Sequence, residues 1–143
     1  MVEGYHCPEQ KISVVPHGVP EAVSYQFSQP KSGPPLAEGV SDQLLRSLGD
    51  SKFLLYFGYL HRRKGLEGLI KAFSQLSLAG EGTVKLVIAG GALQKDYEQK
   101  LSQLVIDAGF TSKVLITGFI SQTEIWYLLD RCLFVVLPAT YSI

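Results

Sequence analysis

Short apolar runs alternate with amphipathic segments along this chain, and that alternation restricts the fold more than any other feature. Several of the runs are apolar on both faces, which is typical of strands in a parallel sheet covered on both sides. A repeating strand–helix order predicts an α/β, Rossmann-like, doubly wound parallel sheet. The predicted strands are residues 12–15, 53–57, 84–89, 114–117 and 133–137.

Three longer segments repeat apolar residues at helical spacing, and a shorter helix is expected over residues 42–48. Gly80 and Gly109 are expected to end the first two helices. The third is expected to begin at Ser121, because Ser121 and Glu124 have the spacing of a capping box. The predicted buried stripes are Leu66, Leu69, Ile70, Phe73 and Leu76; Tyr97, Leu101, Leu104, Val105 and Ala108; and Ile125, Leu128, Leu129 and Cys132.

The chain is long enough for one domain with a real core, since 46% of its 143 residues are apolar and 18% are charged. Residues 41–143 carry the regular pattern and are interpreted as an incomplete Rossmann-like domain. Residues 1–20 are interpreted as the end of an inter-domain segment together with the first strand. Residues 21–40 contain several prolines and no periodicity, so an irregular surface loop is expected there.

The turns that follow the predicted strands are the candidate binding site, because ligands of open α/β sheets bind beyond the carboxyl ends of the strands. Four of these five turns contain glycine, which permits tight turns and close approach of the backbone to a ligand. A structural role is favoured for His17, which lies in the turn after the predicted strand 12–15. The residues singled out for close approach are His17, Gly18, Gly90 and Gly91.

The strongest local signal is the segment His61–Gly65, whose basic turn, Arg62, Arg63 and Lys64, stands directly before a predicted helix. Free amide groups and the helix dipole favour an anion at a helix N-terminus, and the added positive charge suits a diphosphate. The alternative interpretation is a basic turn that is merely solvated. The position at the ligand edge of the sheet favours the functional interpretation.

Several other classes of site are unsupported. The sequence has no Gly-x-Gly-x-x-Gly, no P-loop and no Gly-x-Ser-x-Gly motif, and no cluster of His, Cys or Asp, so no cofactor or metal is expected. Thirteen basic residues balance thirteen acidic ones, which argues against a nucleic-acid partner. No segment is long and apolar enough for a transmembrane helix or a signal peptide, and a cytoplasmic location is expected.

Taken in order, these turns resemble the C-terminal, donor-binding domain of GT-B-fold retaining glycosyltransferases of the family 4, or group 1, type. The resemblance covers most of the chain from about Lys11 onward. The segments that carry it are Ile12–Val19, Tyr56–Leu60, Lys64–Leu66, Leu69–Phe73, Val84–Gly91, Val114–Ile120 with Glu124, and Leu133–Pro138.

The resemblance implies transfer of a sugar, with retention, from a nucleoside-diphosphate sugar to an acceptor that is a glycan, a lipid or a small molecule. The parent enzyme would act in the cytoplasm or at the periphery of a membrane. Residues 41–143 would then be an incomplete nucleotide-sugar-binding domain. The implied contacts are Gly58, Arg62, Arg63 and Lys64 for the donor phosphates, and Gly118, Phe119, Ile120 and Glu124 for the nucleotide base.

Two departures from the family pattern bear on these expectations. Many members have arginine where this chain has Tyr59, so Arg62 or Arg63 is expected to supply the charge. The family's paired glutamates would begin just after Pro138, close to the last residue of the sequence, Ile143, and the N-terminal acceptor domain is absent. The chain is therefore expected to be truncated at both ends, to lack identifiable catalytic residues and to be inactive alone. The alternatives are a nucleotide-sugar epimerase of the same architecture and a non-catalytic paralogue that acts as a binding module.

Overall fold

The computed structural model of the chain describes residues 38–79 and 83–138, which all belong to one compact unit, Pro35–Ile143. The predicted strand at 12–15, the turn with His17 and Gly18, and most of the segment 21–40 lie outside the described residues.

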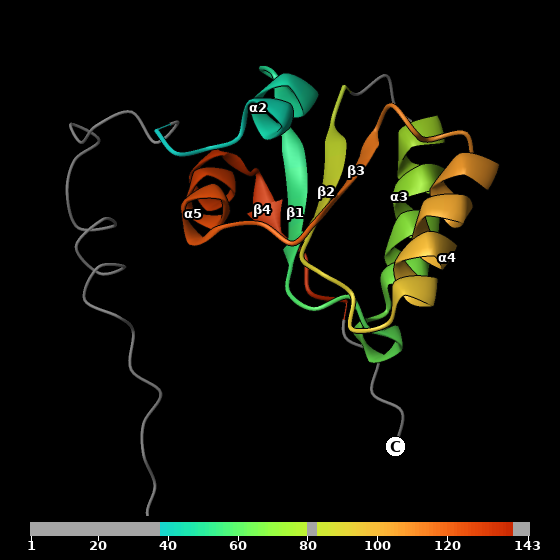
Figure 1. Cartoon of the computed structure of the whole chain (residues 1–143). Helices are drawn as coiled ribbons and strands as arrows, with labels where there is room; N and C mark the ends of the chain where they lie inside the picture. Colours follow the sequence, from blue (N-terminus) through green and yellow to red (C-terminus); the bar gives the residue numbers. More distant parts are fainter. Residues whose placement is uncertain (1–37, 80–82, 139–143) are drawn as a thin grey trace, which may run out of the picture. The chain divides into compact units, whose positions relative to one another are not determined.

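A parallel sheet forms the centre of this unit, with the strand order β3-β2-β1-β4 (Figure 1). Every strand pairs with its neighbour in the parallel sense among the described residues, which confirms the predicted α/β class. The bounds agree closely with those expected from the apolar runs, apart from the shorter last strand. The strands are β1 (Phe53–Phe57), β2 (Lys85–Ala89), β3 (Val114–Gly118) and β4 (Phe134–Val135).

Helices cover both faces of the sheet. In Figure 1, α3 and α4 lie on one side of the strands, and α2 and α5 lie on the other. A chain that places successive helices on both faces of one parallel sheet is doubly wound, as predicted. The bounds are α2 (Asp42–Leu48), the short 3-10 helix η2 (Arg62–Lys64), α3 (Leu66–Ala79), α4 (Lys95–Asp107) and α5 (Gln122–Arg131).

The two faces of the sheet each have their own hydrophobic core. Because strand side chains alternate between faces, Phe53 and Leu55 of β1 pack with α2 and α5, whereas Leu54 and Tyr56 pack with α3 and α4. Strand β2 alternates in the same way, with Val87 on the first face. Because helices cover both faces of the sheet, the side chains on both faces of the central strands are apolar.

Three details of the predicted core are wrong. Leu76 of α3 is 68% exposed, because at 100° per residue it lies about 70° from the centre of its stripe. Ala108 is also exposed, at the C-terminal cap of α4. In α5, Ile125 is only half-buried, and Tyr127, which the predicted stripe left out, is buried.

The last strand is not covered on both sides as its apolar run predicted. β4 lies at the edge of the described sheet and pairs with β1 through only two residue pairs. In the predicted run 133–137, Val135 and Val136 pack against the two cores, whereas three side chains are exposed: Leu133 (50%), Phe134 (57%) and Leu137 (66%).

The strand order reverses at β1, which defines where a ligand would bind. The chain proceeds from β1 outward through β2 to β3, and then returns to place β4 on the other side of β1. Such a reversal separates the turns that follow the two neighbouring strands and leaves a crevice between them. The turn after β1 is therefore the best placed of the described turns to bind a ligand.

Backbone contacts between glycines join the turns at the carboxyl edge. The amide of Gly58 donates to Ala89 O at 2.9 Å, and the amide of Gly90 donates to Gly118 O at 3.0 Å. Gly90 has φ +142°, and a Cβ there would lie 2.0 Å from the carbonyl oxygen of Gly58. The packing of the turns therefore requires glycine at position 90.

We predict that Gly90→Ala destabilises the domain by about 2–4 kcal/mol, because it adds both a steric clash and an unfavourable φ. Gly68→Ala is the matched control, since a Cβ at this helical glycine of α3 meets nothing within 4 Å. The control should raise stability by up to about 1 kcal/mol. Urea unfolding followed through the single tryptophan, Trp126, measures both, and equal stabilities would contradict the packing described.

Candidate functional site

The basic turn after β1 has a defined backbone conformation. His61 caps η2, with its Nδ1 accepting from the Arg63 amide at 3.2 Å, and the Lys64 amide donates to His61 O at 2.8 Å. Gly65 then adopts the left-handed conformation, φ 66°, and α3 begins at the next residue. This cap was not anticipated from the sequence. It fixes the path of the chain directly before the N-terminus of α3.

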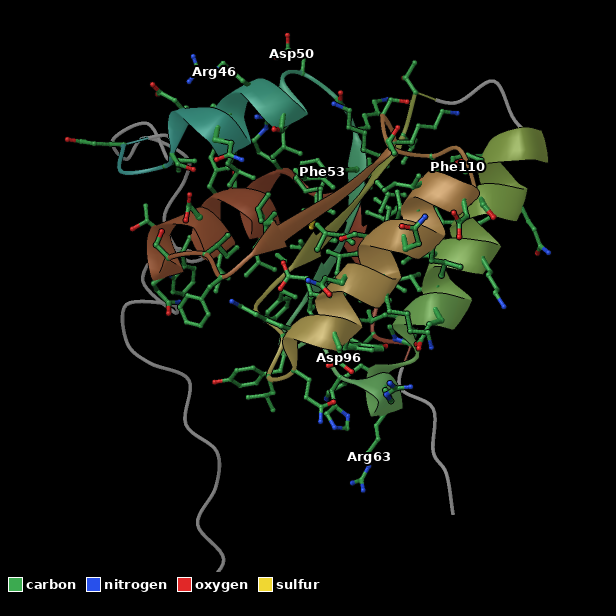
Figure 2. All side chains as sticks on the ribbon, turned by 45° about the vertical axis from the view of Figure 1, so that its right-hand side comes forward. Arg46, Asp50, Phe53, Arg63, Asp96 and Phe110 are labelled. Carbon is green, nitrogen blue, oxygen red and sulfur yellow. The ribbon has the colours of Figure 1, made fainter. Side chains whose placement is uncertain are left out.

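The three cations of the turn are on the surface. Arg62, Arg63 and Lys64 are all exposed, and Figure 2 shows Arg63 extending away from the body of the unit. They precede a helix of fourteen residues, whose first amides have no partners within the helix. The structure thus brings positive charge and a helix N-terminus together at the carboxyl end of β1, as predicted for an anion site.

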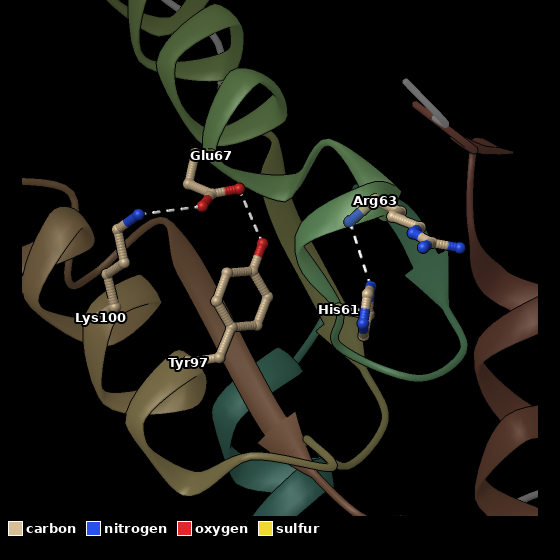
Figure 3. Close-up of polar contacts among 5 residues, drawn as sticks. All are labelled: His61, Arg63, Glu67, Tyr97 and Lys100. Atoms are coloured by element: carbon tan, nitrogen blue, oxygen red, sulfur yellow. Dashed lines mark hydrogen bonds and ion pairs between the residues drawn. The ribbon is translucent and has the colours of Figure 1, made fainter. Parts of the chain in front are cut away.

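A polar network connects the start of α3 to α4 (Figure 3). The hydroxyl of the buried Tyr97 donates to Glu67 Oε2 at 2.7 Å, and Lys100 Nζ lies 3.2 Å from Glu67 Oε1. The guanidinium of Arg62 stands 5.7 Å from the centroid of the Tyr97 ring. None of these contacts was predicted, because the residues are far apart in the sequence.

The network keeps the carboxyl group of Glu67 ionised. Partial burial by itself favours the neutral form, but hydrogen bonds from Tyr97, the Glu67 amide and Lys100 outweigh it and lower the pKa of Glu67. Burial, and then the hydrogen bond to Glu67, raise the pKa of the Tyr97 hydroxyl. The tyrosine therefore remains a neutral donor to an anionic acceptor at neutral pH.

The turn after β3 exposes an aromatic ring. Gly118 has φ 68°, and the following residue, Phe119, is 84% exposed. A Cβ added at Gly91 would lie 3.2 Å from Phe119 Cδ2, so the phenyl ring lies against the backbone of the turn after β2. Ile120 is half-buried and packs on the core that contains α2 and α5. Gly91 and Gly118 thus allow the Phe119 ring to pack at the carboxyl edge of the sheet.

Glu124 is bound on both carboxylate oxygens. Oε1 accepts from the Ser41 hydroxyl at 2.6 Å and from the Ser41 amide at 3.3 Å. Oε2 accepts from the Ser121 amide at 2.8 Å and from its hydroxyl at 2.9 Å. The predicted capping box is confirmed, and its glutamate also joins the starts of α2 and α5.

The contacts made by Glu124 are all within the protein, and its contact with a nucleotide stays a prediction. The side-chain hydrogen bond from Ser41 comes first among the causes that lower the pKa of Glu124, and burial opposes it. The part played by Ser41 could not be read from the sequence, because 83 positions separate it from its partner.

Residues 38–79 and 83–138 lack two further classes of feature. This part of the chain has no group of three or more His, Cys, Asp or Glu residues placed to hold a metal ion. It also has no helix with the length and apolar character needed to span a membrane.

The sequence model of the family described as glycosyl transferases group 1 matches residues 41–142. The chain belongs to this family. The matched segment includes the basic turn, the three glycine turns and the capping box, so the resemblance inferred from the turns is confirmed.

Curated relatives agree with the family. The uncharacterized glycosyltransferase MJ1607 of Methanocaldococcus jannaschii is 30% identical over 140 residues, which is 96% of this chain and 33% of that protein. The alpha-D-kanosaminyltransferase of Streptomyces kanamyceticus is 31% identical over 95 residues, 66% of this chain and 24% of that protein. The chain thus spans a third or less of the length of these relatives.

Solved structures agree with the fold. HepE from Anabaena, in complex with UDP and glucose, has a TM-score of 0.58 and 27% identity over 69% of this chain and 26% of that chain. The C-terminal domain of the glycosyl transferase group 1 family protein LpcC from Francisella tularensis has a TM-score of 0.57 and 24% identity, over 64% of this chain and 48% of that chain. The Rossmann-like, GT-B type of α/β fold is therefore confirmed.

We predict that Glu124→Gln lowers the free energy of unfolding at about pH 7 by about 1–3 kcal/mol, since glutamine keeps one acceptor oxygen and loses the charge. The pKa of Glu124 is lowered in the fold, so its stabilising contribution is present above the ordinary value of about 4.3 and is lost as pH falls through the folded value.

Urea unfolding of both proteins at about pH 7 and about pH 3 tests this, and the gap between them should close on acidification. Glu38→Gln, at an exposed position, is the control and should change little. A gap that stays constant across this pH range would contradict the assignment of charge-assisted bonds to Glu124.

Proposed function

We propose that the carboxyl edge of this sheet binds a nucleoside-diphosphate sugar and presents it for retaining transfer of the sugar to an acceptor. The observation that carries the proposal is the position of the basic turn. It lies at the N-terminus of α3 and beside the reversal of strand order, in a chain that belongs to the glycosyl transferases group 1 family. The complex of the Anabaena relative HepE with UDP supports a nucleotide donor.

In this proposal the diphosphate is held by the turn after β1. Lys64 supplies the principal charge. Many family members have an arginine at the position of Tyr59, and here Arg62 or Arg63 supplies that charge. Gly58 lets the backbone approach, and the amides at the start of α3 donate to phosphate oxygens. Because charge develops on the leaving diphosphate during transfer, a fixed cation here stabilises the transition state more than the ground state.

The nucleotide base is assigned to the turn after β3. Gly118, Phe119 and Ile120 form a short segment whose exposed phenyl ring suits a planar ligand. Glu124 is assigned an indirect part, because it holds Ser121 and so the end of this turn. Gly90 and Gly91 line the turn between the two subsites.

Transfer by the 143-residue chain alone is not part of the proposal. Holding two reactants together contributes about 7–11 kcal/mol to lowering a barrier, and this requires a second surface that positions the acceptor. The described residues form one sheet with its helices, and the proposed site lies along one edge of it. Donor binding is therefore the activity we assign to this chain, with a cytoplasmic site of action for the complete enzyme.

We predict that Lys64→Ala weakens binding of UDP by about 1.5–3 kcal/mol, the scale of a charge-assisted hydrogen bond. Lys52→Ala is the matched control, because Lys52 is equally exposed and precedes β1 at the opposite edge of the sheet. Calorimetric titration of the three proteins measures the change. Equal affinity of wild type and Lys64→Ala would refute the phosphate assignment, as would an equal loss in the control.

A further inference from the structure

One buried tyrosine contacts the basic turn and also the first turn of the helix that follows it. Its ring lies beneath the guanidinium of Arg62, and its hydroxyl donates to Glu67 in the first turn of α3. Lys64 lies between these two residues in the sequence. Figure 3 shows Tyr97 between α4 and the start of α3, with the Glu67 carboxylate directed toward α4. The start of the basic turn and the helix that follows it are thus connected to the same side chain.

We propose that Tyr97, through Glu67 and Arg62, is a positioning residue that fixes the basic turn for a diphosphate. This inference rests on the proposed function. Tyr97 is 1% exposed and does not reach the surface where a ligand would bind, so it acts on the phosphate only through the turn. A side chain with almost no freedom is well suited to hold an exposed loop in one conformation, which lowers the entropy that a ligand must otherwise remove.

The charge arrangement gives the same network a second part in binding. Glu67 is an anion in the first turn of α3, where it would compete with a phosphate for the helix N-terminus. Its two oxygens accept from Tyr97 and Lys100 in addition to its own amide, so the carboxylate is directed toward α4 and a cation offsets its charge. Lys100 thus offsets the acidic charge that lies next to the basic turn.

The chain contains a natural control for this inference. Tyr127 of α5 is also buried, carries the guanidinium of Arg131 at 5.2 Å from its ring centroid, and accepts a hydrogen bond from Arg131 through its hydroxyl oxygen. It lies on the opposite face of the sheet, in the core with α2. Tyr127→Phe therefore repeats the chemical change of Tyr97→Phe away from the basic turn.

The test is an NMR titration of the full 143-residue chain with UDP and with uridine, for wild type, Tyr97→Phe, Tyr127→Phe, Lys64→Ala and the double variant of Tyr97 and Lys64. Tyr97→Phe keeps the buried ring under Arg62 and removes only the bond to Glu67. We expect UDP affinity to fall about three- to tenfold, with uridine affinity unchanged. In the Lys64→Ala background the tyrosine change should alter UDP affinity less than about twofold, because the two residues act through one turn.

Three results would overturn the inference: an unchanged UDP affinity in Tyr97→Phe, an equal loss for UDP and uridine, or the same loss in Tyr127→Phe. An equal loss for both ligands would indicate a general effect on the fold instead of an effect on the phosphate turn. Failure of the proposed function has a different signature, in which wild type and Lys64→Ala bind UDP equally weakly. A thermal melt of each variant checks that the folded fraction is the same.

Discussion

The close approach of two backbones at the carboxyl edge of the sheet is the constraint on which the rest of the site depends. The Gly58 carbonyl occupies the space where any other residue at position 90 would place its Cβ. The Gly90 amide in turn binds the carbonyl of Gly118. Three turns that are distant in the sequence are thereby held in one fixed arrangement, which brings the proposed phosphate and base subsites together on a single edge.

Two glutamates near this edge are held by hydrogen bonds within the protein. Glu67 binds Tyr97 and Lys100, and Glu124 binds Ser41 and Ser121. Hydrogen bonds lower the pKa of both glutamates, so each is an anion whose charge has an internal partner. The cations at 62–64 are exposed, in a chain whose net charge is zero. The proposed anion site therefore depends on local order of this kind and not on overall charge.

Periodicity predicted most of the fold, because the central strands and the helices that cover them bury nearly everything that is apolar in them. Local spacing also predicted the Ser121–Glu124 capping box and the turn that precedes α3. Periodicity predicted burial wrongly for Leu76 and for Phe134 of β4, where burial depends on a neighbouring element. An apolar residue in a periodic pattern does not show whether another element covers it.

The polar contacts around the candidate site could not be predicted from the sequence for a related reason. The sequence pattern placed Tyr97 in an apolar stripe. It gave no indication that the Tyr97 hydroxyl binds Glu67, which is 30 positions away. The Ser41–Glu124 pair is more distant still. Such long-range polar pairs are set by how the elements pack, so sequence patterns located the turns of the site but not the side chains that fix them.

The central claim is that the turn after β1, together with the turn after β3, forms one nucleotide site. Amide chemical shifts of the isotopically labelled chain, recorded while UDP is added, test it most directly. The account predicts that amides in 58–65 and 118–121 shift together along one saturation curve, while those of Lys52 and Lys113, at the amino edge of the sheet, stay in place. Shifts confined to the amino edge, or two groups that saturate at different UDP concentrations, would contradict it.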